Sequence, residues 1–141
     1  GLMRPAALAA LRGADRIIHA GDVGSEEVLA ALRALAPVTA VRGNVDRGPL
    51  GRLRRREVVE AGGASLYVIH DVGDLDLEPE VAGVRAVISG HSHQPCIRRA
   101  GAVLYLNPGS AGPRRFSLPI SVARLTLVGE ELEAEIALLE T

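Results

Sequence analysis

The sequence predicts an α/β fold in which helices and strands alternate at first and strands dominate later. Over the first 42 residues, helical patterns alternate with short apolar runs, which is typical of a parallel sheet with crossover helices. From residue 57 onward, short apolar runs are separated by glycine-containing turns, which predicts strands joined by hairpins. With 141 residues, we expect a single domain spanning 1–141.

The first half of the chain contains two helix signals and two strand signals. A Pro near the start and Gly13 just past the end bound one helix, and Ser25 is suited to N-cap the other. The apolar runs between them end in Gly-Asp and Gly-Asn. The expected elements are a helix over Pro5–Arg12, a strand over Arg16–Ala20, a helix from Ser25 to about Leu35 and a strand over Val38–Arg42.

The second half begins with a loop and continues as strands. Residues 43–56 contain three Gly, one Pro and five Arg, which indicates a loop. Alternating residues from Ile120 to Leu139, with a turn at Gly129 and Glu130, predict a terminal hairpin on a second sheet. The expected strands before it are Glu57–Glu60, Leu66–Ile69, Ala86–Ser89, Ile97–Arg99 and Val103–Leu106.

Composition limits the classes of protein and partner. Hydrophobic residues make up 48% and charged residues 23%, as in ordinary globular proteins, and the aromatic share of 2% requires an aliphatic core. A net charge of -1 and few aromatic rings argue against nucleic-acid binding. The single cysteine fits a reducing cytoplasm. We found no signal peptide or membrane-spanning run, so we expect a cytoplasmic protein without a membrane partner.

Residues of metal-ligating types follow the predicted strands. They are Asp22, Asn44, His70, His91 and His93. Ligands of open α/β sheets bind at the carboxyl ends of strands, where these residues would meet. In extended chain, His91 and His93 point the same way with Cα atoms about 6.5 Å apart. Such a pair can serve two metals about 3.5–4 Å apart. Mixed His, Asp and Asn ligands suit Mn, Fe, Zn or Ni better than Ca or Mg.

Each residue also has a structural interpretation. Asp22 and Asn44 follow glycines and fit turns, and His70 fits a hydrogen-bonded core histidine. His19 lies inside a predicted strand, out of step with the others, and we expect it to be structural. The arginines of residues 43–56 form either a solvated loop or a basic rim that attracts phosphate, and Arg114 and Arg115 raise the same question.

The order of these motifs resembles the calcineurin-like metallophosphoesterases. The matching residues are Gly21-Asp22, then Gly43-Asn44, then His70, then Gly90-His91-Ser92-His93. The branch that looks most similar is the small YfcE-type phosphodiesterases of bacteria and archaea. Residues 43–46, 107–110 and 112–115 also resemble that branch, so the resemblance covers nearly the whole chain.

The resemblance implies a four-layer α/β/β/α sandwich with two metals at one sheet edge. In this family Asp22 would bridge both metals, Asn44, His70 and His91 would complete one site, and His93 would serve the other. A hydroxide activated by two metals would attack phosphorus in line, with Asp22, Asn44 and His91 as the catalytic residues. Mn²⁺ is the usual activator in this branch, with Ni²⁺, Zn²⁺ or Fe as alternatives.

The sequence departs from the family pattern in two places. The Asp-x-His motif, which in relatives ends the first strand just ahead of a segment like Gly1–Pro5, is absent. We therefore expect the fold without its first strand, truncated relative to the family. An upstream segment, a start codon placed too late and a true loss would each explain this. Val45 replaces a His that touches the phosphate or leaving group in many members, which favours good leaving groups such as aryl phosphodiesters.

These observations predict a metal-dependent phosphodiesterase acting on a small phosphodiester or nucleotide-like substrate. The alternative is a scaffold for protein–protein interaction, because the same fold serves that purpose in the eukaryotic retromer complex. A nuclease is the third interpretation and ranks last. Relatives often form dimers or tetramers, so a homo-oligomer is also expected.

Overall fold

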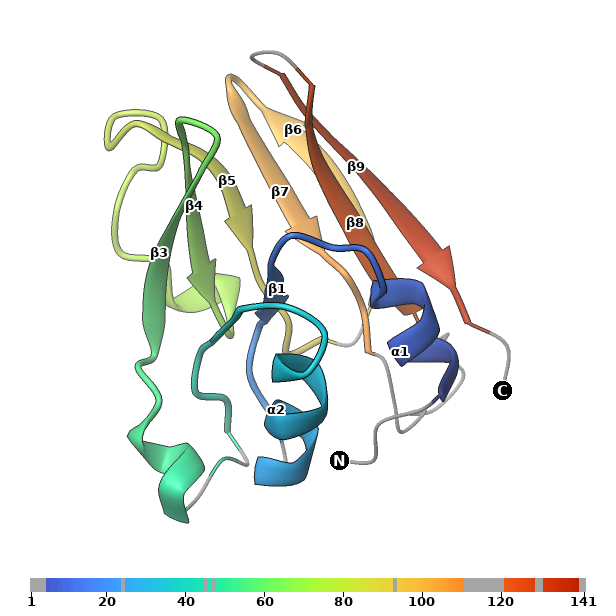
Figure 1. Ribbon diagram of the computed structural model, residues 1–141. Coiled ribbons are helices and arrows are strands. Elements are labelled where there is room, and N and C mark those ends of the chain that lie inside the picture. The colour runs from blue at the N-terminus through green and yellow to red at the C-terminus, as the bar shows by residue number, and fades with distance from the viewer. Residues whose placement is uncertain are drawn as a thin grey trace.

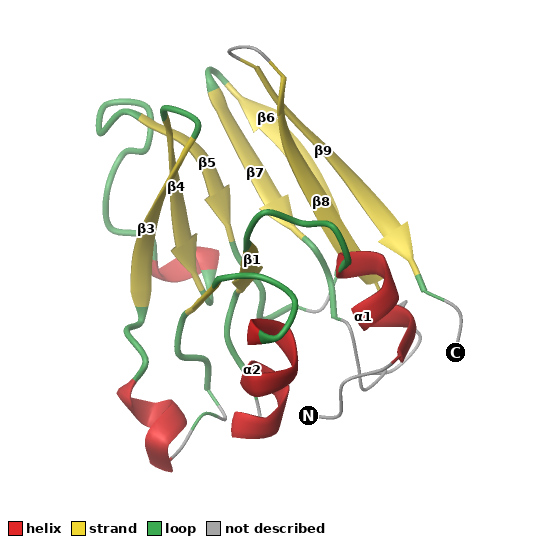
Figure 2. Ribbon diagram, in the orientation of Figure 1, coloured by secondary structure: helices red, strands yellow, loops and turns green. Residues whose placement is uncertain are grey.

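The structure is a computed structural model that describes residues 5–23, 25–44, 46, 48–92, 94–110, 121–128 and 131–139 (Figures 1 and 2). Its α-helices are α1 (Pro5–Leu11) and α2 (Glu26–Arg33), and its 3-10 helices are η1 (Gly48–Arg52) and η2 (Val72–Asp74). The strands are β1 (Ile17–His19), β2 (Val38–Ala40), β3 (Arg56–Ala61), β4 (Ala64–Ile69), β5 (Val84–Ile88), β6 (Cys96–Ala100), β7 (Val103–Asn107), β8 (Ser121–Val128) and β9 (Glu131–Leu138).

One five-stranded sheet has the order β3-β4-β5-β7-β6. Its three central strands are parallel, and the outer strands β3 and β6 are antiparallel to their neighbours. The central strands are buried on both faces, which explains why their sequences are continuous apolar runs. The prediction of strands joined by hairpins is confirmed for β3 and β4, where Gly62 and Gly63 have the positive φ that a tight turn requires.

The remaining strands form two smaller sheets. β1 pairs with β2 in parallel, and β8 pairs with β9 antiparallel. The expected terminal hairpin on a second sheet is therefore confirmed for the described residues. Within the part of the chain that the structure describes, β1 and β8 each have a single strand partner.

The core consists of three apolar clusters between layers. The largest lies on the inner face of the five-stranded sheet, where Val68 and Leu104 share a cluster with Val41, which follows β2, and with Leu132 of β9. A second cluster seats α2 on β1 and β2, and a third covers the outer face of the five-stranded sheet beneath η2 and the loop after it. The layers are therefore helices, small sheets, large sheet and an outer η2 segment.

Local sequence explains the helix that covers β1 and β2. Ser25 caps α2, because its side chain accepts a hydrogen bond from the Val28 backbone N–H at 3.4 Å. Glu26 and Glu27 in the first turn and Arg33 in the last complement the helix dipole. The α2 signal in the sequence is thus confirmed. No described helix has the length and apolar character needed to cross a membrane.

Candidate metal centre

Four of the five expected ligands come together beyond the carboxyl ends of strands. Asp22 follows β1, Asn44 follows β2, His70 follows β4 and His91 follows β5. The His70 Nε2 atom lies 3.2 Å from the Asp22 Oδ2 atom and 3.3 Å from the His91 Nδ1 atom. The Asn44 Nδ2 atom lies 3.3 Å from the same His91 nitrogen. Strands from both the small and the large sheet thus supply one cluster, which we name the rim cluster.

The hydrogen bond of His70 to the backbone fixes which of its nitrogens is free. His70 is buried, and its Nδ1 lies 2.7 Å from the carbonyl oxygen of Ala20. A carbonyl can only accept, so Nδ1 carries the proton and donates it. In the neutral ring Nε2 then has a lone pair, and this lone pair faces the Asp22 carboxylate. A backbone-anchored imidazole of this kind is the usual outer support of a metal-binding histidine.

Two acceptors that face each other need a proton or a cation between them. Metal–nitrogen and metal–oxygen bonds of about 2.0–2.2 Å put neighbouring ligand atoms about 3.0–3.4 Å apart. The separations of 3.2 and 3.3 Å in the rim cluster fall in that interval. Among the described residues, however, no three His, Cys, Asp or Glu side chains already surround a metal position. The rim cluster therefore fits a divalent cation only after small side-chain rotations, including a turn of the Asn44 amide that presents its oxygen.

A carboxylate supports His91 from its other side. The His91 Nε2 atom lies 3.8 Å from the Asp71 Oδ2 atom, while the other Asp71 oxygen accepts from the Gly73 backbone N–H at 2.9 Å. That second bond caps η2 and fixes the direction of the carboxylate. The sequence analysis missed Asp71. Its only sequence signal was that it directly follows His70.

Two ligand positions have backbone conformations that side chains rarely adopt. Asp22 has φ of 56° and His91 has φ of 69°. Non-glycine residues in this left-handed region are uncommon and cluster at functional sites, where the surrounding structure enforces them. The strain at both positions therefore favours a functional interpretation of the rim cluster over that of ordinary turns.

The glycine before each of three ligands is required by close packing. A Cβ on Gly21 would collide with the His70 ring, and a Cβ on Gly43 would collide with the Asp22 backbone nitrogen and side chain. A Cβ on Gly90 would come within 3.2 Å of the Ala20 carbonyl oxygen. The repeated Gly-ligand pattern in the sequence thus lets the loops approach closely enough for their side chains to meet.

Two further polar side chains hold the loops that carry the ligands. Asp46 is buried, and its Oδ2 accepts from the Gly43 backbone N–H at 2.8 Å, which fixes the loop before Asn44. Asn107 donates to the Gly90 carbonyl oxygen at 3.0 Å and to the Ser92 hydroxyl at 3.1 Å. It therefore tethers the loop that carries His91.

His19 has the structural environment expected for it. Its Nδ1 accepts a hydrogen bond from the Gly21 backbone N–H at 3.2 Å. Burial lowers the pKa of His19, and the nearby carboxylates of Asp46 and Asp22 oppose that shift. The ring stays neutral near pH 7 and braces the turn that leads to Asp22.

Arg54 and Arg56, two of the described arginines of residues 43–56, are paired with neighbours. Arg56 contacts the Asp76 carboxylate at 2.5 Å, and Arg54 lies 3.7 Å from Glu57. Arg42 donates to the Gly51 carbonyl oxygen at 3.0 Å. These pairs favour the solvated-loop interpretation for Arg54 and Arg56. His93, Val45, Arg47, Arg114 and Arg115 lie outside the described residues.

Comparison with known proteins identifies the family. Residues 2–130 match the calcineurin-like phosphoesterase superfamily domain. The chain is 40% identical over 134 residues to a probable metallophosphoesterase of Methanothermobacter thermautotrophicus, covering 90% of this chain and 77% of the relative. The chain belongs to the calcineurin-like phosphoesterase superfamily. The family resemblance in the motifs is thereby confirmed.

Solved structures of the same fold support the expected fold class. A novel archaeal phosphodiesterase matches with a TM-score of 0.75 at 19% identity, over 93% of this chain and 89% of its own. Wild-type Vps29 of Entamoeba histolytica complexed with Zn²⁺ matches with a TM-score of 0.68 at 23% identity, over 88% of this chain and 82% of its own. The metallophosphoesterase fold predicted from the sequence is confirmed.

Proposed function

We propose that this protein is a metal-dependent phosphodiesterase. Asp22, Asn44, His70 and His91 are the ligands of one divalent cation, and His93 with Asp22 serves a second. The observation that carries the proposal is that His70 Nε2 lies within 3.3 Å of both Asp22 Oδ2 and His91 Nδ1, and that the bond to Ala20 leaves Nε2 as an acceptor. Family membership supports phosphoester hydrolysis as the reaction.

The side chains of the rim cluster have separable roles. Divalent cations held there would lower the pKa of water and neutralise charge on the phosphoryl oxygens. His70 is oriented by its bond to the Ala20 carbonyl oxygen, and Asp22 and His91 present their side chains from left-handed backbone conformations. Asp46 fixes the Asn44 loop through Gly43. The His70 ring and the loop that carries Asn44 are thus each fixed by a hydrogen bond to the backbone.

We further propose Mn²⁺ as the activating metal and small phosphodiesters as substrates. Mixed imidazole, carboxylate and amide donors suit Mn²⁺, and also Zn²⁺, Ni²⁺ or Fe. The likeness to a zinc complex of Vps29 supports a transition metal as the bound cation. Val45 cannot donate a proton, so we propose substrates whose leaving group needs none, such as aryl or nucleotide-like phosphodiesters.

The test is hydrolysis of bis(p-nitrophenyl) phosphate with added Mn²⁺. Asp22→Asn and His91→Ala should each lower kcat/KM by about 100-fold or more, because each removes a ligand. Asp74→Asn is the matched control, since Asp74 is exposed on η2 and outside the rim cluster. Equal activity in wild type and both ligand variants would show that the site is assigned wrongly.

A protein-binding scaffold is the competing function, favoured by the likeness to Vps29. Metal binding separates the two functions. Calorimetric titration of the metal-free chain with Mn²⁺ should give stoichiometric binding that Asp22→Asn weakens about 10-fold or more. If the chain neither binds Mn²⁺ at micromolar concentrations nor hydrolyses the substrate, the scaffold is favoured instead.

A further inference from the structure

The carboxylate of Asp71 lies between the rim cluster and η2, and its two oxygens have different neighbours. Oδ1 accepts a hydrogen bond from the Gly73 backbone N–H at 2.9 Å and caps η2. Oδ2 faces the Nε2 atom of His91 at 3.8 Å. Because Asp71 directly follows His70, the end of β4 supplies a buried imidazole on one side of His91 and a negative charge on the other.

The ring of His91 reaches from the rim cluster to Asp71. Its Nδ1 atom points into the cluster, where it lies 3.3 Å from His70 Nε2 and 3.3 Å from Asn44 Nδ2. Its Nε2 atom points to Asp71. The rings of His91 and His70 meet edge to face, with their centroids 5.2 Å apart and their planes at 80°. In this orientation Nδ1 is the nitrogen of His91 that can serve a cation in the rim cluster.

The neighbours of Nδ1 favour opposite tautomers of His91. A neutral imidazole carries one proton, and Nδ1 has a lone pair for a metal only when that proton is on Nε2. The bond to Ala20 leaves His70 Nε2 as an acceptor, which by itself would draw the His91 proton to Nδ1. The Asn44 amide nitrogen is a donor and favours the lone pair on Nδ1. These two neutral neighbours therefore oppose each other.

The charge of Asp71 resolves this competition. A carboxylate can only accept, so it favours the tautomer of His91 that has its proton on Nε2. Hydrogen bonds to an ionised acceptor are roughly twice as strong as those between neutral groups, so Asp71 outweighs the pull of the His70 ring. The separation of 3.8 Å exceeds a direct hydrogen bond, but the attraction between a full charge and an N–H dipole acts across it.

We propose that Asp71 is a positioning residue that holds the proton of His91 on Nε2 and thereby keeps the Nδ1 lone pair directed into the rim cluster. The bond from the Gly73 N–H fixes the carboxylate, so the cap of η2 also serves as the support of a histidine that follows β5. The use of that lone pair by a cation rests on the proposed function. The position of the proton is a property of the metal-free chain.

Asp71→Asn reverses the preference while keeping the cap. Asparagine caps helices as well as aspartate does, and the Gly73 N–H requires an acceptor, so the amide oxygen takes the place of Oδ1. The amide nitrogen, a donor, then faces His91 Nε2 and stabilises the tautomer with the proton on Nδ1. Asp74→Asn is the matched control, because it makes the same change at an exposed position of the same 3-10 helix.

Nitrogen-15 NMR of the histidine rings in the metal-free chain measures the tautomer directly. At about pH 8.5, where free histidine is neutral, wild type and Asp74→Asn should carry the His91 proton on Nε2, and Asp71→Asn should carry it on Nδ1. Loss of the signal in His91→Ala assigns the resonance. In calorimetric titration, Asp71→Asn should bind Mn²⁺ about 10- to 100-fold more weakly than Asp74→Asn. Urea unfolding should give equal stabilities for both variants, since both keep the cap.

Three results would overturn the positioning role of Asp71. They are a wild-type His91 with its proton on Nδ1, an Asp71→Asn chain that keeps the proton on Nε2, and a switched tautomer with undiminished Mn²⁺ affinity. The first needs no variant, so it decides even where Asp71→Asn is unstable.

Failure of the proposed function has a different signature. Wild type would then bind no Mn²⁺, while the proton of His91 would still lie on Nε2 and move in Asp71→Asn. That combination supports the action of Asp71 on His91 and contradicts the metal-dependent activity alone.

Discussion

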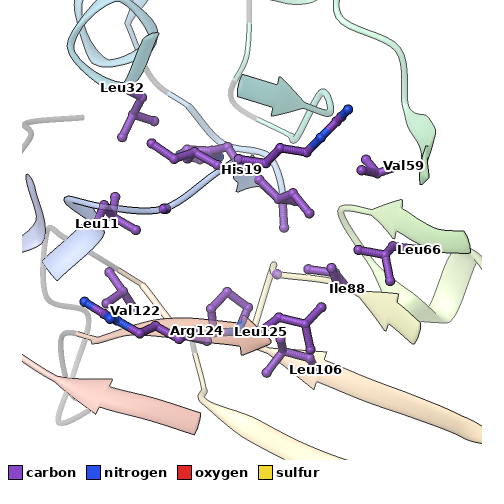
Figure 3. Close-up of a pocket in the computed structure, with 18 of the residues that line it drawn as sticks. Leu11, His19, Leu32, Val59, Leu66, Ile88, Leu106, Val122, Arg124 and Leu125 are labelled. Carbon is purple, nitrogen blue, oxygen red and sulfur yellow. The ribbon is translucent and has the colours of Figure 1, made fainter. Parts of the chain in front are cut away.

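The five-stranded sheet and the pair of small sheets differ in how completely their strands are paired. In the large sheet the three central strands have neighbours on both edges and apolar cover on both faces. In the small sheets each described strand has one partner, and a groove of about 890 Å³ lies between β1, β8 and the inner face of the five-stranded sheet (Figure 3). We call this space the interstrand groove. Among the described strands, the central strands of the large sheet are thus paired on both edges, while β1 and β8 are paired on one.

The ligands of the rim cluster come from both the large sheet and the small sheets. His70 and His91 follow strands of the large sheet, whereas Asp22 and Asn44 follow strands of the small pair. The two histidines therefore stand on the more rigid support. The positions of Asp22 and Asn44 depend on close glycine contacts and on Asp46. The free energy of unfolding and the affinity for metal should consequently respond differently to substitutions in the large sheet and in the small sheets.

The largest expected effect comes from deleting a core side chain of the complete sheet. Leu104 lies on β7 with 1% of its surface exposed, so Leu104→Ala should lower the free energy of unfolding by about 3 kcal/mol or more. Leu125 on β8 borders the interstrand groove, where packing is already incomplete. Leu125→Ala should lower the free energy of unfolding by only about 1 kcal/mol. Urea unfolding followed by circular dichroism measures both.

The ratio of the losses in unfolding free energy for these two variants tests the comparison between the large sheet and the small sheets. Equal losses for Leu104→Ala and Leu125→Ala would mean that the groove side is as tightly packed as the large sheet in solution. In that case an occupant or a rearrangement would already fill the interstrand groove.

A smaller effect is expected from adding one methyl group between Asp22 and the Asn44 loop. A Cβ on Gly43 would overlap the Asp22 backbone, so Gly43→Ala should destabilise the fold by about 2 kcal/mol. It should also weaken Mn²⁺ binding about 10-fold or more by displacing Asp22. Gly51→Ala on the neighbouring η1 is the matched control, since the nearest neighbour of its Cβ would be an ordinary contact at 3.7 Å. Calorimetric titration and urea unfolding report the two quantities.

If Gly43→Ala and Gly51→Ala bind Mn²⁺ with equal affinity, the close approach of Gly43 does not position Asp22 for metal binding. A loss of stability without a loss of affinity would separate the two roles of Gly43. Close packing would then serve the fold alone, and Asp22 would need another means of support.

Much of the fold was predictable because its signals are local. The cap at Ser25, the glycines at residues 62 and 63 and the apolar runs of the central strands each specify an element without reference to the rest of the chain. The order of strands in the large sheet was not predictable. It depends on which apolar faces meet, and periodicity does not encode this.

The candidate site was predictable as a set of residue types but not as a geometry. Their positions after predicted strands indicated that Asp22, Asn44, His70 and His91 would meet. The structure places neighbouring members of this set within contact distance. Asp71 was missed because a carboxylate that acts through another side chain has no signature of its own. The sequence also did not show why a glycine precedes Asp22, Asn44 and His91. The reason lies in close contacts between loops that are distant in sequence. Whether His93 joins the site stays a prediction.

The smallest expected effect concerns pH and reports on β1, the strand that borders the interstrand groove. Burial lowers the pKa of His19 below its model-peptide value of 6.5, against the opposing charges of Asp46 and Asp22. As the pH falls below 6.5, the unfolded chain binds a proton at this position before the folded chain does, so protonation favours unfolding. The stability contributed by neutral His19 is therefore present above this pH and is lost below it.

His19→Asn isolates this contribution, because asparagine offers an acceptor to the Gly21 N–H but does not titrate. Urea unfolding at about pH 7.5 and about pH 5.5 should show a smaller loss of stability for His19→Asn than for wild type. Carboxylates titrate alike in both chains, so the difference between the two slopes belongs to His19. A steeper slope in His19→Asn would mean that His19 is charged in the folded state. In that case Asp46 and Asp22 would outweigh burial in β1, and the edge of the interstrand groove would be more open to water than the structure indicates.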